Sequence, residues 1–333
     1  MKKKFDVYGL GNALMDIQLR VSTSDLELLK LRKGGMQLVD AESQMRIFDF
    51  FADKEAHYAS GGSAANTIIA LAGLGASTAY GCLVADDVFG HRYQSEMQEL
   101  GILTPNARRE GKITGTCLIL ISEDAERTMN TNLGVSAELD EQDVDEETIQ
   151  HSSWVYLEGY PLSSDSGSRA ALKALQYAKK HGAKVALTLS DAFIVEHFRP
   201  ALEACLQGTD LVFANHTEAC AFAKTTNRDQ AFQVLCNQVP NVVMTLGAEG
   251  SLIRYQGETH KQAAVTAKAI DLTGAGDMYA GAFLYGISHS SSLQDSAKLA
   301  SFLAAKVVST LGPRLNENLR ELARSLKIIT GDF

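Results

Sequence analysis

The sequence predicts an α/β protein whose central, mostly parallel sheet is flanked by helices, with a small β-sheet lid beside it. Short apolar segments typical of buried strands alternate with longer segments typical of helices. The connections between them are short and carry Gly, Asn or Asp. Strand–helix–strand units of this kind are nearly always right-handed, so they place their strands in parallel with helices on both faces.

The expected elements follow in order along the chain. A first strand starts at Phe5 and ends at the glycines before Asn12, and an alanine-rich helix at 66–74 precedes a strand at 79–84. The second half continues with strands at 154–158, 184–188 and 211–214, separated by helices at 168–181 and around 196–206. Because ligands of open parallel sheets bind beyond the carboxyl ends of the strands, we expect the chemistry in the loops at that edge.

Two segments interrupt the alternation, at about 13–40 and about 107–133. The second contains Thr116 to Ile121, an apolar run typical of a strand. We expect these two segments to form the lid of one domain that spans residues 1–333.

Composition limits the class of protein. The content of 45% hydrophobic and 21% charged residues is typical of a soluble globular protein, and the net charge of -9 disfavours a nucleic-acid partner. The five cysteines are scattered without metal-ligand spacing, which favours reduced thiols, a cytoplasmic location and no structural zinc. No apolar run is long enough for a membrane span, so we expect no membrane partner.

The strongest motif is Asp271-Leu-Thr-Gly-Ala-Gly-Asp277, directly before a predicted helix of small residues. A helix N-terminus offers unpaired N–H groups and a positive dipole end, and glycines let a phosphate approach the backbone. Gly274, Ala275 and Gly276 would form an anion hole with Asp277, whose carboxylate could accept the proton of an attacking hydroxyl. The alternative is that Asp277 only caps the helix.

Polar residues and glycines recur at the other predicted strand ends. Amide and carboxylate side chains there can recognise vicinal hydroxyls, because each makes two hydrogen bonds. The residues at the N-terminal strand ends are Asn12, Asp16, Gly61, Gly62 and Asn66, and those at the later ends are Asn215, Glu218, Thr245, Gly247 and Gly250. Neither group of residues indicates a binding site by itself. Their joint occurrence in this order along the chain is what predicts one.

Taken together, these motifs resemble the ribokinase-like (PfkB) carbohydrate and nucleoside kinases over the whole chain. The N-terminal glycine signature of that family is similar to 60–76 and the C-terminal signature to 271–283. The resemblance implies an α/β core with a β-lid, Mg-ATP as phosphoryl donor, and transfer to a primary hydroxymethyl group.

The resemblance also assigns roles position by position. Asp277 would be the general base beside the anion hole 274–277. The substrate hydroxyls would be bound by Asn12, Asp16, Gly61, Gly62 and Asn66. Asn215 and Glu218 would organise Mg²⁺ and phosphates through water, and Thr245, Gly247 and Gly250 would contact ATP. Arg127 is similar to a lid arginine that lies on the transferring phosphates, with an ordinary salt bridge as the alternative.

A potassium site is a further hypothesis from the resemblance. Many members hold a monovalent cation beside the anion hole, and the corresponding residues here are Asp271, Thr273, Val307, Thr310 and Gly312. Leu272 stands where a threonine is usual, which puts the cation dependence in doubt but leaves the two glycines and Asp277 intact.

The acceptor is less defined than the reaction. Gly11 to Ile17, with 61–63 and Asn66, is more similar to adenosine kinases than to ribokinases or phosphofructokinases, and Tyr160 or Phe193 could stack on a purine. A ribose- or fructose-type sugar kinase and a catalytically silent nucleotide-binding regulator are the alternatives. A Rossmann dehydrogenase is disfavoured, because no Gly-x-Gly-x-x-Gly follows the first strand. The chain is expected to be a monomer or a homodimer.

Overall fold

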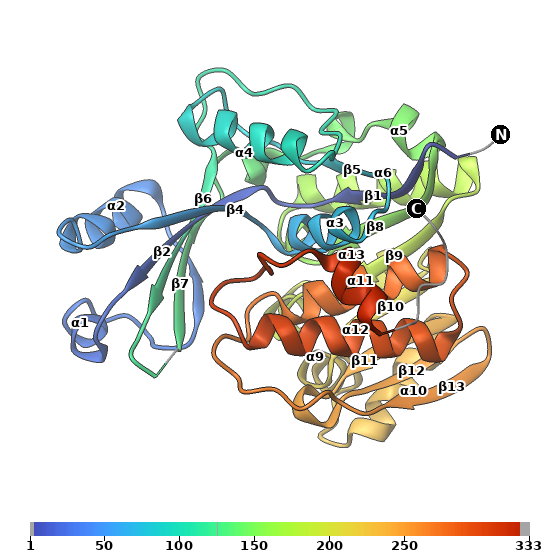
Figure 1. The fold of residues 1–333 in the computed structure, drawn as a ribbon. Helices are drawn as coiled ribbons and strands as arrows, with labels where there is room; N and C mark the ends of the chain where they lie inside the picture. Colours follow the sequence, from blue (N-terminus) through green and yellow to red (C-terminus); the bar gives the residue numbers. More distant parts are fainter. Residues whose placement is uncertain (1–2, 125, 327–333) are drawn as a thin grey trace.

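Two β-sheets of unequal size organise the molecule (Figure 1). The computed structural model describes residues 3–124 and 126–326. The larger sheet has eight strands in the order β13-β12-β11-β10-β9-β8-β1-β5. Their bounds are β1 Phe5–Leu10, β5 Thr78–Gly81, β8 Ser152–Glu158, β9 Lys184–Thr188, β10 Leu211–Asn215, β11 Asn241–Thr245, β12 Ser251–Tyr255 and β13 Glu258–Gln262.

The larger sheet is parallel from β5 to β11, β12 pairs antiparallel with β11, and β13 pairs antiparallel with β12. The parallel strands are largely apolar and buried, as expected where helices cover both faces, whereas the edge strand β13 is polar. β1 pairs with β5 on one side and with β8 on the other, so the strand order reverses at β1. Such a switch point opens a crevice at the carboxyl ends of the strands.

Helices cover the larger sheet on both faces (Figure 1). One face carries α3 Ser63–Leu74, α11 Ala275–Ser288, α12 Leu293–Val308 and α13 Leu319–Ser325. The other carries α5 Glu146–Gln150, α6 Asp165–His181, α8 Arg199–Leu206, α9 His216–Ala223 and α10 Arg228–Gln238. α4 Val88–Glu99 adds Tyr93 and Met97 to the first of these layers, and α7 Ala192–His197 adds Val195 to the second. Short 3₁₀ turns occupy Gly134–Glu138, Glu141–Asp143, Tyr160–Ser163 and Gly247–Glu249.

The helix boundaries follow from local chemistry. Ser164 accepts a hydrogen bond from the Gly167 N–H at the start of α6, and Gly182 ends that helix in the left-handed region. The single helix expected around 196–206 is two helices, because Pro200 lies in the first turn of α8 and a new helix starts there.

The smaller sheet has five strands in the order β3-β7-β6-β2-β4 and projects to the left of the main body in Figure 1. The strands are β2 Leu14–Arg20, β3 Met36–Leu38, β4 His57–Gly61, β6 Gly115–Ile121 and β7 Arg127–Asn132. Helices α1 Thr23–Leu28 and α2 Ala41–Phe50 belong to the same unit. The sheet therefore includes β4, which lies outside both segments from which we expected a lid.

Side chains alternate between the two faces of the smaller sheet, as the strand period of two requires. One face packs apolar residues such as Ile17, Leu19 and Leu118 against α1 and α2. The opposite face points Leu14, Asp16, Cys117 and other residues into a cavity that this sheet shares with the larger one. The smaller sheet thus forms one wall of that cavity.

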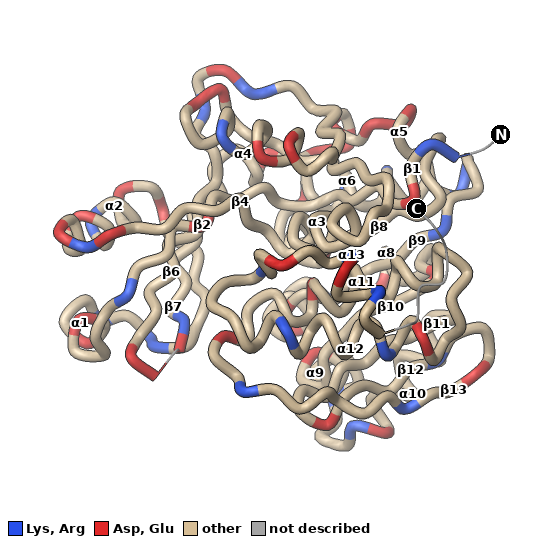
Figure 2. The backbone as a smooth tube through the Cα atoms, viewed as in Figure 1, with Lys and Arg blue, Asp and Glu red and all other residues tan. Residues whose placement is uncertain are grey.

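Charged residues are spread over outer helices and loops on all sides of the described chain (Figure 2). No helix in the part of the chain that the structure describes is long and apolar enough to cross a membrane. All five cysteines are free thiols, and only Cys220 is not buried.

Candidate active site

The cavity lies at the carboxyl ends of the parallel strands, between the two sheets, and has a volume of about 380 Å³. Strand register explains why distant polar residues meet there. Leu10 is paired with Leu157, Glu158 with Thr188, and Asn215 with Thr245, so the strand ends form one edge. Of the predicted site residues, the cavity is lined by Asn12, Asp16, Gly62, Asn66, Asn215, Glu218, Thr245, Thr273, Gly274, Gly276 and Asp277.

Asp277 lies in the first turn of α11, and its side chain does not cap that helix. The N-cap residue is Gly274, in the left-handed region with φ 73°. The Asp277 carboxylate instead accepts hydrogen bonds from Ser63 Oγ at 2.7 Å and from Asn66 Nδ2 at 3.1 Å. Burial raises the pKa of Asp277 to about 6, while the bonds from Ser63 and Asn66 and the charge of Arg314 act in the opposite direction.

The start of α11 has the geometry of an anion site. Gly276 is exposed, and a Cβ added there would meet no heavy atom within 4 Å. Gly274 could not carry a side chain, because its Cβ would collide with the Pro313 carbonyl oxygen. The described chain offers no hydrogen-bond acceptor to the N–H groups of Gly276 and Asp277. Two free donors and the positive end of a 14-residue helix therefore face the cavity.

The opposite wall carries the residues expected to bind substrate hydroxyls. Asp16 is buried, yet none of the described residues donates a hydrogen bond to its carboxylate. Burial raises the pKa of Asp16 to about 6, and the charges of Arg127 and Arg314 lower it. Gly62 has φ 106°, and a Cβ there would strike the Asn12 carbonyl oxygen, so glycine is required where the chain passes so close.

Glu158 is a site residue that we did not single out from the sequence. Its carboxylate accepts the Asn12 N–H at 2.7 Å and the Ala64 N–H at 2.6 Å, and so joins β8 to the start of α3. Burial raises its pKa to about 7, and the Asp277 carboxylate adds to the rise. The sequence could have indicated this residue, because Glu158 is a carboxylate at the end of an apolar strand, at the edge of the sheet where we expected the site.

A second set of contacts supports Asn66, the partner of Asp277, and the sequence analysis did not identify it either. Arg314 Nε donates to Asn66 Oδ1 at 3.1 Å, and Arg314 Nη1 lies 2.6 Å from Glu96 Oε1. Glu96 also accepts from Ser60 Oγ at 2.6 Å. Arg314 and Glu96 stand in a C-terminal loop and in α4, far from any predicted strand end, so no sequence pattern identified them.

Asn215 and Glu218 line the end of the cavity where we expected the nucleotide. The two residues form a capping box at the start of α9, with Asn215 Oδ1 accepting the Glu218 N–H at 2.9 Å. Burial raises the pKa of Glu218 to about 7, and the Asp191 and Asp277 carboxylates add to it. Gly247 and Gly250 shape the turn after β11 with positive φ but do not line the cavity, and neither do Gly61 and Ala275.

This group of carboxylates fits a divalent cation that arrives with a nucleotide. Among the residues the structure describes, no cluster of three or more His, Cys, Asp or Glu could hold a metal alone. Mg²⁺ commonly keeps several waters and takes the rest of its ligands from phosphates and one or two carboxylates. Burial is the main cause of the raised pKa values of Glu158 and Glu218, neighbouring carboxylates add to each, and a bound divalent cation would act in the opposite direction.

Arg127 does not line the cavity, because its guanidinium is buried against Asp271, with Nη1 3.3 Å from both carboxylate oxygens. Asp271, one of the residues expected to hold K⁺, also accepts the N–H groups of Thr273 and Gly312 through its carboxylate, and the Val307 carbonyl accepts from Thr310. The role of Arg127 and the potassium site stay predictions.

The fold and the site define a kinase class, and comparison with known proteins gives the family. The chain belongs to the pfkB family of carbohydrate kinases, whose model matches residues 51–319. Adenosine kinase from Saccharomyces cerevisiae is 28% identical over 326 residues, which cover 91% of this chain and 95% of the yeast protein. Fructokinase from Escherichia coli is 28% identical over 235 residues, covering 68% of this chain and 76% of that protein.

Solved structures agree with this membership. Adenosine kinase from Sinorhizobium meliloti superposes with a TM-score of 0.90 at 35% identity, covering 97% of this chain and 99% of that one. A probable sugar kinase from Rhizobium etli CFN 42 superposes with a TM-score of 0.91 at 32% identity, covering 98% and 100%. The predicted fold class and the family resemblance are thereby confirmed.

Proposed function

We propose that this protein transfers a phosphoryl group from Mg-ATP to the primary hydroxymethyl group of a nucleoside, with Asp277 as general base. The observation that carries the proposal is the position of Asp277 between two free N–H groups of α11 and the polar wall with Asn12, Asp16 and Asn66. A hydroxyl bound to that wall lies next to both a proton acceptor and an anion site.

The transfer step follows from the groups around Asp277. One carboxylate oxygen is held by Ser63 and the other by Asn66, and each oxygen keeps a lone pair for the acceptor hydroxyl. As the hydroxyl oxygen bonds to phosphorus, its proton passes to Asp277 and ADP leaves. A pKa of about 6 leaves Asp277 mostly ionised at neutral pH, yet more basic than an ordinary aspartate.

The chain's own groups would place the nucleotide. The N–H groups of Gly276 and Asp277 would receive the negative charge that develops on the transferred phosphoryl group. Asn215 and Glu218 would hold Mg²⁺ through water, and the bound ion would neutralise phosphate charge. Thr245 lines the same end of the cavity, with Gly247 and Gly250 forming the turn behind it.

The lining of the cavity favours a nucleoside over a bare sugar as acceptor. A sugar presents hydroxyls all round, whereas a purine needs an apolar or aromatic wall. The smaller sheet and the loops opposite it supply Leu14, Met36, Leu38, Ile119, Met129, Leu133, Tyr160 and Phe193. The similarity to adenosine kinases from yeast and Sinorhizobium meliloti points the same way.

A panel of acceptors tests this proposal. ADP release is measured with adenosine, inosine, guanosine, ribose, fructose and fructose phosphates at equal concentration. The highest kcat/KM is expected with a purine nucleoside. A higher value with ribose or fructose would support the sugar kinase alternative, which the match to fructokinase favours. Nucleotide binding without turnover for every acceptor would support the silent regulator.

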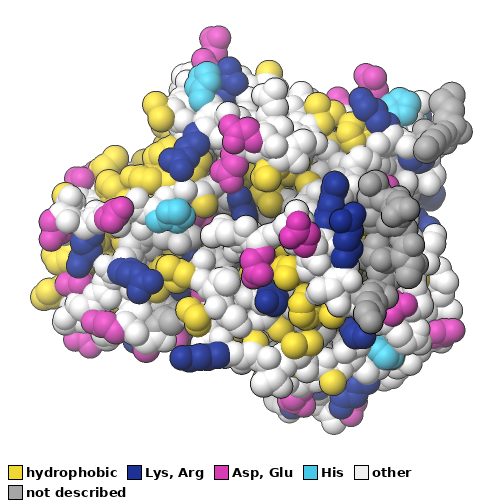
Figure 3. Space-filling model, in the orientation of Figure 1, with side chains coloured by type: hydrophobic (Ala, Val, Ile, Leu, Met, Phe, Trp, Pro, Cys, Tyr) yellow, Lys and Arg dark blue, Asp and Glu magenta, His cyan; other side chains and the backbone are white. Residues whose placement is uncertain are grey.

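We further propose a cytoplasmic homodimer. Five free thiols are typical of a reducing compartment. Hydrophobic surface gathers at the left of Figure 3, over the smaller sheet and α2. Leu28 of α1 and Met45 and Phe50 of α2 are exposed. A second copy of the chain would cover this surface. Sedimentation velocity distinguishes the dimer from a monomer.

A further inference from the structure

A second cavity lies between the smaller sheet and the main body. Its volume is about 750 Å³, which exceeds that of the active-site cavity, and the two cavities share no lining residue. One wall is formed by β2, the end of β6 and residues 54–59, and the other by α4 and residues 311–316. A molecule bound there would contact both parts of the protein at once.

Basic side chains outnumber acidic ones on the walls of the second cavity. Arg20 and Lys54 lie on the side of the smaller sheet, and Arg92 and Arg314 lie on the side of the main body. Two glutamates also line the cavity, and one of them, Glu96, is already paired with Arg314 at 2.6 Å. The local charge is therefore positive in a protein whose net charge is -9, which favours a negatively charged ligand.

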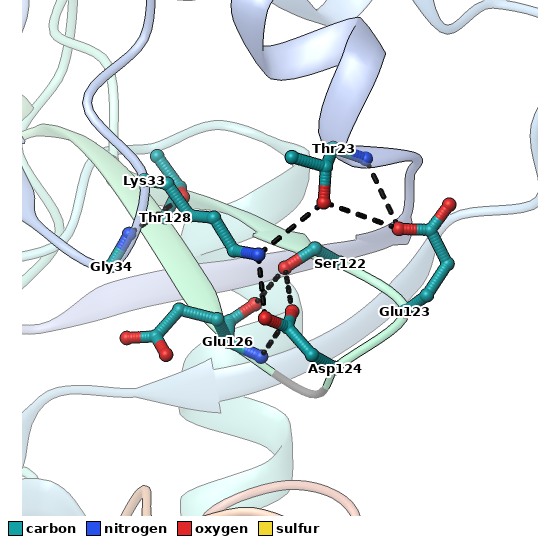
Figure 4. A network of polar contacts seen from close by, with 8 residues as sticks. All are labelled: Thr23, Lys33, Gly34, Ser122, Glu123, Asp124, Glu126 and Thr128. Carbon is teal, nitrogen blue, oxygen red and sulfur yellow. Dashed lines mark hydrogen bonds and ion pairs between the residues drawn. The ribbon is translucent and has the colours of Figure 1, made fainter.

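The charges on the smaller sheet are not neutralised by the chain itself. Arg20 is in register with Ile121 at the end of β6. The turn after β6 carries Asp124, which forms an ion pair of 2.6 Å with Lys33 on the other side of the turn (Figure 4). Neither Arg20 nor Lys54 forms an ion pair with a described residue, and both are exposed. Both charges are therefore available to a ligand.

Gln18 supplies a buried polar group to the same cavity. It is 6% exposed, and its side-chain amide forms no hydrogen bond with any described residue. A Cβ on Gly312 would lie 4.0 Å from Gln18 Nε2, so the amide lies where the 311–316 segment meets β2. Because buried amides are normally hydrogen-bonded, a ligand oxygen in this cavity would meet an unused donor.

Arg314 connects the second cavity to the proposed base. Its Nε donates to Asn66 Oδ1 at 3.1 Å, and Asn66 Nδ2 donates to the Asp277 carboxylate at 3.1 Å. Its Nη2 atom is buried and finds no acceptor among the described residues. An anion that drew this guanidinium toward the second cavity would release Asn66 and move positive charge away from Asp277.

We propose that the second cavity binds a small organic molecule with two or more oxyanion groups, phosphate or carboxylate, and that this ligand lowers kcat through Arg314. Guanidinium groups bind both kinds of oxyanion through paired hydrogen bonds. Two such groups are needed because the basic residues lie on opposite walls, and a cavity of this size suits an organic ligand better than a single ion. The effect on kcat rests on the proposed kinase function, whereas binding does not.

Calorimetric titration tests the site without turnover. The unmodified protein is titrated with 2,3-bisphosphoglycerate and with citrate, while a saturating non-hydrolysable ATP analogue occupies the active-site cavity and free Mg²⁺ is held constant. At least one of the two anions is expected to bind, and the stronger one shows whether phosphate or carboxylate is preferred. The double variant Arg20→Met, Lys54→Met is expected to bind it about tenfold or more weakly.

The matched control is Arg32→Met, which removes an exposed positive charge of the same part of the protein outside the second cavity. Its affinity for the anion is expected to equal that of the unmodified protein. Absence of binding for both anions, or equal binding by the double variant and the control, would overturn the proposal.

Steady-state kinetics test the link to Asp277. At saturating ATP and acceptor, the bound anion is expected to lower kcat about fivefold or more. Without the anion, Arg20→Met should keep the kcat of the unmodified enzyme, and with it the variant should resist inhibition. The residual rate of Arg314→Met should not respond to the anion. Inhibition that excess ATP or acceptor relieves, or an unchanged kcat with the anion bound, would contradict the proposal. If no acceptor is phosphorylated at all, the kinase proposal fails, and calorimetry still decides whether the site exists.

Discussion

At the scale of single residues, Asp277 differs from an ordinary helix-cap aspartate by its partners. Its carboxylate is directed at Ser63 and Asn66 on a different helix, which orients both oxygens toward the cavity. We expect Asp277→Asn to lower kcat by roughly a thousandfold or more while nucleotide affinity is nearly kept, because the amide preserves the shape and cannot take a proton. Steady-state rates and calorimetric titration with ATP measure the two effects.

The matched control for Asp277 is Asp229→Asn. Asp229 is also in the first turn of a helix, α10, but it is exposed. Its replacement should leave kcat unchanged. A kcat for Asp277→Asn close to that of the control would refute the assignment of the base.

A substitution of Asp16 should affect the KM of the acceptor and not that of the nucleotide. Its buried carboxylate receives no hydrogen bond from the described residues and faces the polar wall of the cavity. We expect Asp16→Ala to raise KM for the acceptor by about tenfold or more and KM for ATP by less than about twofold. Initial-rate measurements with each substrate varied in turn separate the two, and equal increases would exclude a substrate-side role.

Arg314 should act on catalysis through Asn66. It donates to Asn66 Oδ1, which turns the amide so that Nδ2 points at Asp277. We expect Arg314→Met to lower kcat roughly tenfold and to move the acidic limb of the pH–rate profile to higher pH, since its charge lowers the pKa of Asp277. Arg92→Met on α4 is the control, because Arg92 contacts the Tyr58 carbonyl and not Asn66. A lower kcat with an unmoved pH profile would indicate a purely structural role.

At the scale of elements, the contact between α3 and α11 sets how Asp277 meets its partners. The helices touch at Gly281, where an added Cβ would lie 2.8 Å from Ala70 Cβ and 2.8 Å from the Thr67 carbonyl oxygen. We expect Gly281→Ala to lower the free energy of unfolding by about 1–3 kcal/mol, because two packed backbones would have to separate. Urea denaturation of the ligand-free protein measures the change.

Gly276→Ala is the stability control in the same helix. A Cβ at Gly276 meets nothing within 4 Å, so this change should leave the free energy of unfolding nearly unaltered. Equal destabilisation by the two substitutions would contradict the role of the contact with α3, because helix propensity favours alanine over glycine and cannot cause the loss.

The elements that sequence reasoning found are those with strong local patterns. Sequence analysis predicted the apolar strands flanked by glycine, such as β1, and the glycine turn before α11. Each of these patterns lies within a few consecutive residues. β4 was missed, because His57 to Gly61 has no apolar alternation and gains its place only by pairing with β2. Arg314 and Glu96 were missed for the same reason: their importance comes from contacts between parts of the chain more than 200 positions apart.

The catalytic and binding roles assigned from the family resemblance remain predictions. The structure brings most of those residues into one cavity, whereas Arg127 and all the expected potassium ligands except Thr273 do not line it. Sequence could not show this separation, because residues 127 and 271 meet only through the folding of the smaller sheet onto the larger one.

At the scale of the whole molecule, four buried carboxylates make the ligand-free protein sensitive to pH. Burial raises the pKa of Asp16 and Asp277 to about 6, and of Glu158 and Glu218 to about 7. In an unfolded chain these groups titrate near pH 4. Between these values the folded state binds more protons than the unfolded one, so stability falls as pH rises.

We therefore expect the melting temperature of the ligand-free protein to decrease from pH 5 to pH 7.5 and to level off above. Thermal melts at half-unit steps measure the trend. Glu158→Gln should show a shallower decrease, since one of the four titrating groups is gone. A melting temperature that rises over this range would contradict the assignment of these groups.

The chain passes between the two sheets at Asn12 and again at Gly62, and these crossings lie side by side. Part of the cavity wall expected to bind the acceptor is carried by the smaller sheet, while Asp277 and the start of α11 belong to the larger body. Substitutions on the smaller sheet could thus alter which molecule is accepted while Asp277 and the start of α11 stay unchanged. Such a division would allow relatives as different as an adenosine kinase and a fructokinase to share one fold.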